Sequence, residues 1–149
     1  MPTKNGELAQ FPSLRDKVVV ITGGATGIGR TFVRRFCDQG SRVFFLDKDE
    51  PAGRQAVTEL ETASDDVARS VKFLPCDVTD TSVLQAAIAS IGDQSGGIEA
   101  VGSKGPNDGR HELDELTPRS WDDCMAVNIK HQFFYIDPRA AVSEDARGG

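Results

Sequence analysis

Closely spaced glycines in residues 22–29 are the part of the sequence that could perform the most specific chemistry. The segment reads Thr22-Gly23-Gly24-Ala25-Thr26-Gly27-Ile28-Gly29. Gly23 permits a tight turn, Gly27 lets the backbone approach a phosphate, and Gly29 lets a following helix pack close to the preceding strand. Because the N-terminus of that helix offers free N–H groups and a partial positive charge, the segment predicts a pyrophosphate-binding turn.

Asp47 ends the next apolar run, residues 42–47. A carboxylate at this position accepts hydrogen bonds from the ribose hydroxyls of adenosine and repels a 2′-phosphate. The pair of features therefore predicts a nicotinamide dinucleotide site that prefers NAD over NADP. A less specific interpretation is that the glycines mark an ordinary strand-to-helix turn and that Asp47 is a solvated strand end.

Three motifs in order resemble those of the short-chain dehydrogenase/reductase family. Residues 22–29 look like its TGxxxGIG signature, Cys76-Asp77-Val78-Thr79-Asp80 is similar to its D-V-T/S-D segment, and Val127-Asn128 resembles its V-N segment. The resemblance extends over residues 17 to about 134, the N-terminal half of the family. It implies an oxidoreductase that transfers a hydride between nicotinamide and a small carbonyl or alcohol substrate, often as a homotetramer.

The resemblance also implies roles for individual residues. Besides Asp47, the cofactor contacts would come from Thr22, Gly23, Gly27, Ile28 and Gly29, which form the turn. Asp77 would contact the adenine amino group and Val78 would line the adenine ring. Asn128 would support a bound water in the proton relay, which is an auxiliary catalytic position.

The catalytic serine and the Tyr-x-x-x-Lys pair of the family have no counterpart here. The one tyrosine is Tyr135, and Arg139 stands where the lysine would be, with Pro138 between them. A tyrosine with a pKa near ~10 is a poor base at neutral pH unless a neighbouring cation lowers that pKa. We therefore expect the catalytic half to lie beyond Gly149, and an inactive, truncated nucleotide-binding relative is an alternative function.

The fourth strand and the loop after it are a second departure. The weak apolar pattern at residues 98–101 predicts a fourth strand. The family's N-N-A-G segment would then fall on Ser103-Lys104-Gly105-Pro106, which matches none of its four residues. Lys104 places a charge, and Pro106 lacks an N–H donor, where small residues should approach the cofactor.

Hydrophobic periodicity supplies the elements that would position these motifs. Strands are predicted at residues 17–22, 42–47 and 71–74, and helices follow each of them, with Gly40 ending the first and Asp80 capping the third. Thr117-Pro118 begins a further helix. The β-α-β alternation predicts an α/β, Rossmann-like, doubly wound parallel sheet truncated after about four strands. We expect a flexible tail at 1–14, a partial NAD(P)-binding domain at 15–136 and a polar tail at 137–149.

A phosphate-binding loop of a nucleotide hydrolase is the nearest rival interpretation. Residues 24–31 read G-x-x-x-x-G-R-T, which departs from the phosphate-loop pattern at Arg30, where that pattern has lysine. Arginine is not equivalent to the compact lysine ammonium that reaches the β- and γ-phosphates. The rival also gives no role to Asp77-Val78.

Charge and cysteine content exclude several other classes. The 149 residues carry 17 basic and 23 acidic side chains, a formal net charge of -6, which disfavours an extended nucleic-acid surface. No apolar run is long enough for a membrane span. Cys37, Cys76 and Cys124 are widely spaced and odd in number, which indicates reduced thiols rather than a disulfide framework or a zinc site. We expect a cytoplasmic protein with no nucleic-acid, membrane or metal partner.

Overall fold

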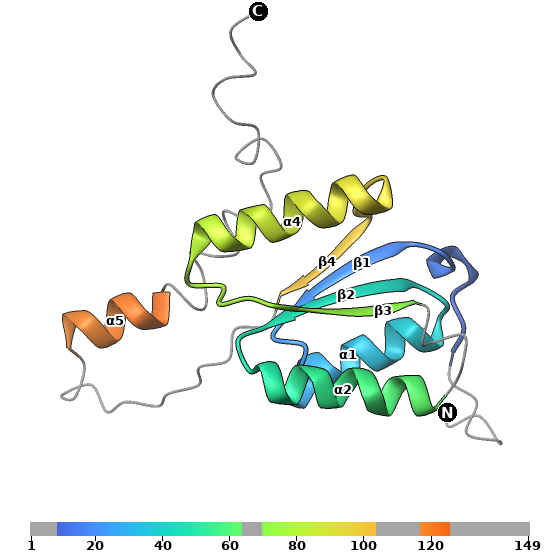
Figure 1. Ribbon diagram of the computed structural model, residues 1–149, viewed down its shortest axis with the longest axis horizontal. Coiled ribbons are helices and arrows are strands. Elements are labelled where there is room, and N and C mark those ends of the chain that lie inside the picture. The colour runs from blue at the N-terminus through green and yellow to red at the C-terminus, as the bar shows by residue number, and fades with distance from the viewer. Residues whose placement is uncertain (1–8, 64–69, 104–116, 126–149) are drawn as a thin grey trace, which may run out of the picture.

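A four-stranded parallel sheet with helices on both faces forms the body of the molecule (Figure 1). The computed structural model describes residues 9–63, 70–103 and 117–125. The strand order is β3-β2-β1-β4, and every paired strand is parallel. The strands are β1 (Val18–Thr22), β2 (Arg42–Asp47), β3 (Val71–Pro75) and β4 (Ala100–Ser103), and the helices are α1 (Gly27–Asp38), α2 (Glu50–Ala63), α4 (Thr81–Ser95) and α5 (Pro118–Met125). This order confirms the predicted Rossmann-like α/β fold.

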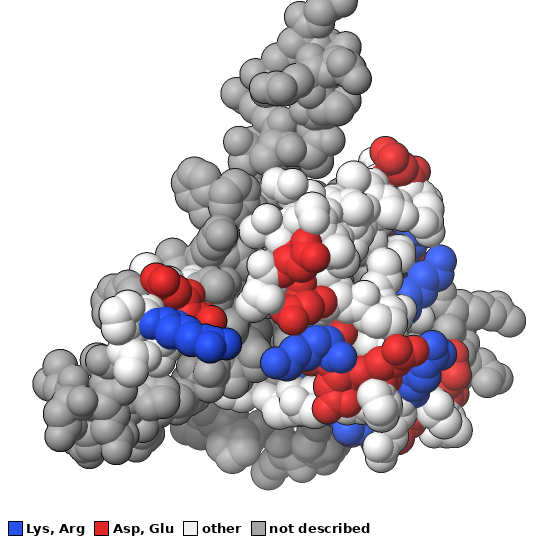
Figure 2. Space-filling view, turned by 60° about the vertical axis from the view of Figure 1, so that its left-hand side comes forward, with Lys and Arg blue, Asp and Glu red and all other residues white. Residues whose placement is uncertain are grey.

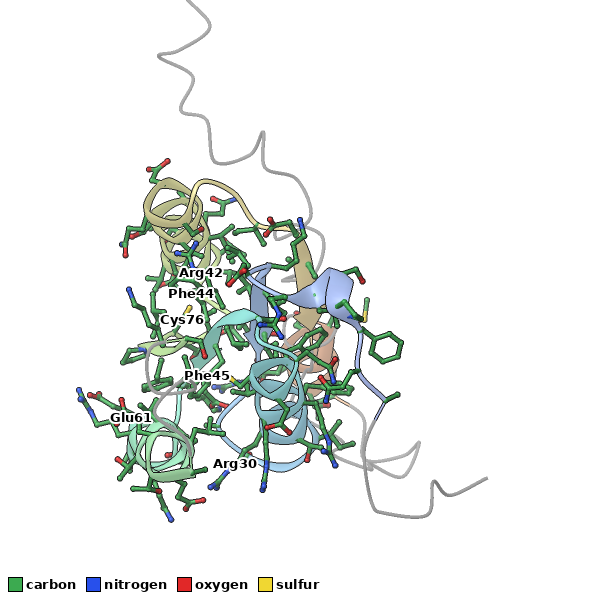
Figure 3. The ribbon with its side chains drawn as sticks, turned by 90° about the vertical axis from the view of Figure 1, so that its right-hand side faces the viewer. Arg30, Arg42, Phe44, Phe45, Glu61 and Cys76 are labelled. Atoms are coloured by element: carbon green, nitrogen blue, oxygen red, sulfur yellow. The ribbon has the colours of Figure 1, made fainter. Side chains whose placement is uncertain are left out.

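Alternating residues of the strands fill two separate cores, one on each face of the sheet. On the side of α1 and α2, the buried members include Val19, Ile21, Val33, Val43, Phe45 and Ala56. On the side of α4, they include Val18, Val20, Phe44, Leu46, Cys76, Leu84 and Ile91. Figure 3 shows Phe44 and Cys76 toward α4 and Phe45 on the opposite side of the sheet. All five residues of β1 are buried, as the continuous apolar run predicts for a strand covered on both faces.

The ends of the helices follow the predicted capping residues. Gly40 has a φ of 80° directly after α1, a left-handed conformation that glycine adopts without a Cβ penalty. Asp80 caps α4, since its Oδ1 accepts the N–H groups of Ser82 and Val83, both at 3.1 Å. The Ser82 hydroxyl, which donates to the same oxygen at 2.7 Å, and these N–H groups hold the pKa of the Asp80 carboxyl below its usual range. Thr117 Oγ1 accepts the N–H of Ser120 at 3.1 Å and so caps the start of α5.

The fourth strand lies two residues later than the sequence pattern predicts. It runs from Ala100 to Ser103, not over residues 98–101, and Val19 lies opposite Ala100 in the register with β1. Ile98 instead packs against the core beneath α4. Glu99 bonds to Val18 twice: its carboxylate accepts the N–H of Val18 at 2.7 Å, and its own N–H donates to the Val18 carbonyl at 3.0 Å.

The segment before β1 lies against the C-terminal end of α1. The predicted tail includes a 3-10 helix at Pro12–Leu14. The Gln39 side chain makes two hydrogen bonds to the residues just before this short helix. Its Oε1 accepts the N–H of Phe11 at 2.6 Å, and its Nε2 donates to the carbonyl of Ala9 at 3.0 Å. Ser41 adds a hydroxyl bond to the Leu14 carbonyl at 2.8 Å. Residues 9–14 are thus attached to the domain by side chains from the α1–β2 connection.

Candidate functional site

The predicted site residues gather where β1, β2 and β3 end. Because parallel strands share one carboxyl edge, the turn after β1, Asp47 at the end of β2 and Asp77 after β3 are brought to the same edge of the sheet. Figure 2 brings this side of the molecule forward, and acidic and basic side chains lie there in alternating groups. The structure therefore brings together the cofactor residues that the sequence pattern selected within the described ranges.

The glycines of the turn are required by its geometry. Gly23 and Gly27 have φ values of 66° and 56°, the left-handed region that favours glycine. A Cβ built at Gly29 would lie 2.7 Å from the carbonyl carbon of Gly23 and closer still to its oxygen, so α1 packs directly against the turn. A Cβ built at Gly24 would lie 2.6 Å from the Cβ of Phe45. The predicted close approach of helix and strand at Gly29 is confirmed.

The N-terminus of α1 is open to a ligand. Thr26 precedes the helix, and its side chain makes no capping hydrogen bond. The first N–H groups of a helix have no acceptor within that helix, so those of Gly27, Ile28 and Gly29 are free of intrahelical bonds. Apart from its chain neighbours and its own helix backbone, no atom of the described residues lies within 4 Å of a Cβ built at Gly27, and Ile28 is 59% exposed. The turn thus presents free donors and a partial positive charge to open space, which fits a pyrophosphate.

Asp47 joins the end of β2 to the glycine turn. Its Oδ2 accepts the N–H of Ala25 at 3.0 Å. Its Oδ1 accepts the N–H of Asp49 at 3.1 Å, at the entry to α2. The carboxylate is half-buried and lies beside the turn, at the place where a ribose-binding acid is required. The sequence pattern selected this residue but did not reveal its contact with Ala25.

Asp77 and Val78 lie in the turn that follows β3. Asp77 Oδ1 accepts both the hydroxyl and the N–H of Thr79, at 2.7 and 3.0 Å. These two bonds, with the nearby positive charge of Lys48, hold the pKa of the Asp77 carboxyl below its usual range. Asp77 is therefore ionised at neutral pH and exposed, and Val78 beside it is half-buried. A charged acceptor next to an apolar side chain suits an amino-substituted aromatic ring.

Cys76 and Arg30 lie near this edge and serve the fold. Burial, with the carboxylates of Asp77 and Asp80, raises the pKa of the Cys76 thiol to about 11, so the thiol is protonated and not a nucleophile. Arg30 of α1 forms an ion pair with Glu59 of α2 and lies on the side of the sheet where these two helices pack (Figure 3). The Arg30 guanidinium is thus paired between α1 and α2. It does not serve as the phosphate-binding cation that the hydrolase interpretation requires.

Several predicted residues lie outside the described residues. These are Asn128, Tyr135 and the Lys104-Gly105-Pro106 part of the altered loop. Ser103, the first residue of that loop, ends β4 opposite Thr22 in the register. Within the described ranges, no group of three or more His, Cys, Asp or Glu side chains could hold a metal ion. The helices of the same ranges include none with the length and apolarity that a membrane crossing requires.

Comparison with known proteins agrees with this geometry. The profile of the short chain dehydrogenase family matches residues 17–141. A probable galactose dehydrogenase of Rhizobium meliloti is 30% identical over 141 residues, which are 95% of this chain and 54% of that protein. A D-xylose 1-dehydrogenase of Caulobacter vibrioides is 34% identical over 141 residues, which are 95% of this chain and 54% of that protein. The family match leaves no place for the phosphate-loop hydrolase interpretation, which is wrong.

A solved structure shows the same arrangement of elements. The crystal structure of a short chain dehydrogenase from Mycobacterium smegmatis superposes with a TM-score of 0.75 at 26% identity, covering 91% of this chain and 55% of that chain. The chain therefore spans about half the length of the curated relatives and of the solved structure that it matches. The family match over residues 17–141 includes the sheet edge described above.

Proposed function

The chain belongs to the short-chain dehydrogenase family, whose members are oxidoreductases that use NAD(P) and act on small molecules, and from that premise we propose that it binds NAD in preference to NADP. The glycine turn would hold the pyrophosphate through the amides of Gly27, Ile28 and Gly29. Asp47 would accept the adenosine ribose hydroxyls. Asp77 and Val78 would bind the adenine ring.

The position of Asp47 is the observation that carries the preference for NAD. Its carboxylate lies within hydrogen-bond distance of the turn, bonded to Ala25 N–H at 3.0 Å. A group in that place meets the ribose of a nucleotide whose pyrophosphate occupies the turn, and its negative charge repels a 2′-phosphate. Lys48 follows it directly in sequence, and its positive charge also contributes to the lowered pKa of Asp77.

The proposed reaction is hydride transfer with a small carbonyl or alcohol substrate. NAD, when bound, supplies the hydride acceptor or donor at its nicotinamide ring. The described residues would bind and orient the adenosine and pyrophosphate. By the family resemblance, Asn128 would support a water of the proton relay.

An aldose is the substrate class that we propose for the whole protein. Galactose and D-xylose dehydrogenases are among the relatives that align with 95% of this chain. A sugar hydroxyl oxidised to a carbonyl is an alcohol–carbonyl pair of the kind that nicotinamide chemistry requires. Dehydrogenase assays of a polypeptide containing this chain, with galactose and xylose against a linear alcohol, would distinguish this class from others.

The 149-residue chain by itself is proposed to bind the cofactor without turnover. Its sole tyrosine is followed by Pro138 and Arg139, not by the lysine that lowers a tyrosine pKa. This observation favours the second candidate function, a nucleotide-binding relative without its own catalytic base. NADH formation by the purified chain in the presence of an aldose would contradict it.

Calorimetric titration with NADH and NADPH tests the cofactor proposal. We expect NADH to bind more tightly, by about tenfold or more, because a hydrogen bond to a charged acceptor contributes about 1.5–3 kcal/mol. Asp47→Ala is expected to reduce the ratio of the two affinities toward one. Equal affinities for the unmodified chain, or tighter binding of NADPH, would contradict the preference, and binding of neither would contradict the cofactor site itself.

A further inference from the structure

Three consecutive amides of the glycine turn are held by the end of β2. The N–H of Gly23 donates to the Leu46 carbonyl at 2.8 Å, and the N–H of Gly24 donates to the same oxygen at 3.3 Å. The N–H of Ala25 donates instead to Asp47 Oδ2 at 3.0 Å. The first two bonds use a backbone oxygen that any residue at position 46 would supply. The third bond exists only because position 47 carries a side-chain acceptor.

The amide of Ala25 needs that acceptor because Ala25 is fully buried. Its exposed fraction is 0%. A buried N–H without an acceptor destabilises the conformation that holds it. Thr26 follows without a side-chain cap, and α1 begins at Gly27. The hydrogen bond from the Ala25 N–H to Asp47 is therefore the last one that a side chain makes to the turn. The helical amides that would bind the pyrophosphate follow directly after it.

The Asp47 carboxylate is itself fixed from a second direction. Its Oδ1 accepts the N–H of Asp49 at 3.1 Å, and Asp49 Oδ1 accepts the N–H of Ala52 at 3.0 Å in the first turn of α2. A carboxylate oxygen can accept two hydrogen bonds, so each oxygen of Asp47 keeps one acceptor position. One carboxylate can thus hold the turn and accept a ribose hydroxyl at the same time.

We propose that Asp47 is a positioning residue for the pyrophosphate site, in addition to accepting the ribose. Its carboxylate fixes the glycine turn in the binding conformation before any nucleotide arrives. The identity of the ligand rests on the proposed function, but the bond from Ala25 to Asp47 does not depend on a nucleotide. The consequence is that cofactor selectivity and phosphate affinity are coupled through one side chain.

Amide hydrogen exchange of the nucleotide-free chain tests this positioning role. In Asp47→Ala we expect the Ala25 amide to exchange about tenfold faster or more, relative to the Gly23 amide, whose acceptor is a backbone carbonyl. The ratio of two amides in one turn removes any change in global stability. Asp47→Asn restores an oxygen acceptor and should slow Ala25 exchange compared with Asp47→Ala.

Asp77→Ala is the matched control for this experiment. It removes a carboxylate from the same sheet edge, but one that bonds to Thr79 and not to the glycine turn. We expect the ratio of Ala25 to Gly23 exchange to stay at its original value in Asp77→Ala. A ratio that is unchanged in Asp47→Ala, or that is the same in Asp47→Ala and Asp47→Asn, would overturn the positioning role.

NADPH affinity supplies a second readout that separates positioning from charge. Asp47→Ala and Asp47→Asn remove the same negative charge, so loss of repulsion alone predicts equal NADPH affinity. Positioning predicts that Asp47→Asn binds NADPH about tenfold more tightly than Asp47→Ala. Equal affinities would contradict the coupling. Absence of all nucleotide binding would instead count against the proposed function, while the exchange ratio would still decide the role of Asp47 in the turn.

Discussion

Gly29→Ala is expected to destabilise the fold and to abolish measurable NADH binding. The added Cβ would overlap the carbonyl group of Gly23, which is backbone and cannot rotate away. Insertion of a methyl group into such a contact costs about 1–3 kcal/mol and sometimes more, and here α1 must move away from the turn that it helps to form. Calorimetric titration with NADH and a thermal melt measure the two effects. The melting temperature should fall by several degrees, at roughly 2–4 °C per kcal/mol for a chain of this size.

Gly92→Ala is the control for that substitution. Gly92 lies inside α4, and a Cβ built there meets no atom within 4 Å in the described part of the chain, apart from its neighbours and its own helix backbone. Alanine is favoured over glycine in a helix interior by roughly 0.8–1 kcal/mol, so this variant should be slightly more stable and should bind NADH unchanged. If Gly29→Ala and Gly92→Ala behaved alike, the close packing of α1 on the turn could not be the reason for the glycine at 29.

Phe45→Ala is expected to cause the largest loss of stability in the sheet. Phe45 has an exposed fraction of 0%, and its ring centroid lies 5.1 Å from that of Phe73. Its Cβ would also lie 2.6 Å from a Cβ built at Gly24 in the glycine turn. Truncation of a buried phenylalanine costs about 3–5 kcal/mol, a large part of the roughly 5–15 kcal/mol that stabilise an ordinary domain. Urea unfolding followed by circular dichroism measures this loss.

Phe32→Ala makes the same change at an exposed site. The Phe32 side chain on α1 is 47% exposed, and alanine has the higher helix propensity. Its free energy of unfolding should therefore fall by much less than that of Phe45→Ala. Similar losses in the two variants would mean that Phe45 does not lie at the centre of the core.

Local patterns were sufficient to predict the first three strands, the turn and most helix ends. The apolar run before Gly23, the glycine spacing and the capping residue Asp80 each act over a few residues, and the structure has β1, the left-handed turn and the α4 cap where they indicate. Gly29 was predictable for the same reason, since close packing of a helix after a strand needs a residue without a Cβ.

Contacts between distant residues could not be predicted in this way. The Glu99 carboxylate accepts the N–H of Val18, which is far away in sequence, and β4 begins at Ala100, two residues later than the sequence pattern predicts. The bond from Ala25 to Asp47 depends on how β2 lies beside the turn, and the pairing of Arg30 with Glu59 depends on how α1 lies beside α2. Periodicity carries no information about such side-chain directions.

Mapping of amide chemical shifts in an isotope-labelled chain titrated with NADH tests the central claim most directly. The claim is that the glycine turn and the ends of β2 and β3 form one dinucleotide site. We predict the largest shift changes at the amides of residues 23–29, at Asp47 and Lys48, and at Asp77 and Val78. Shift changes confined to other surfaces, or none at millimolar NADH, would contradict the account.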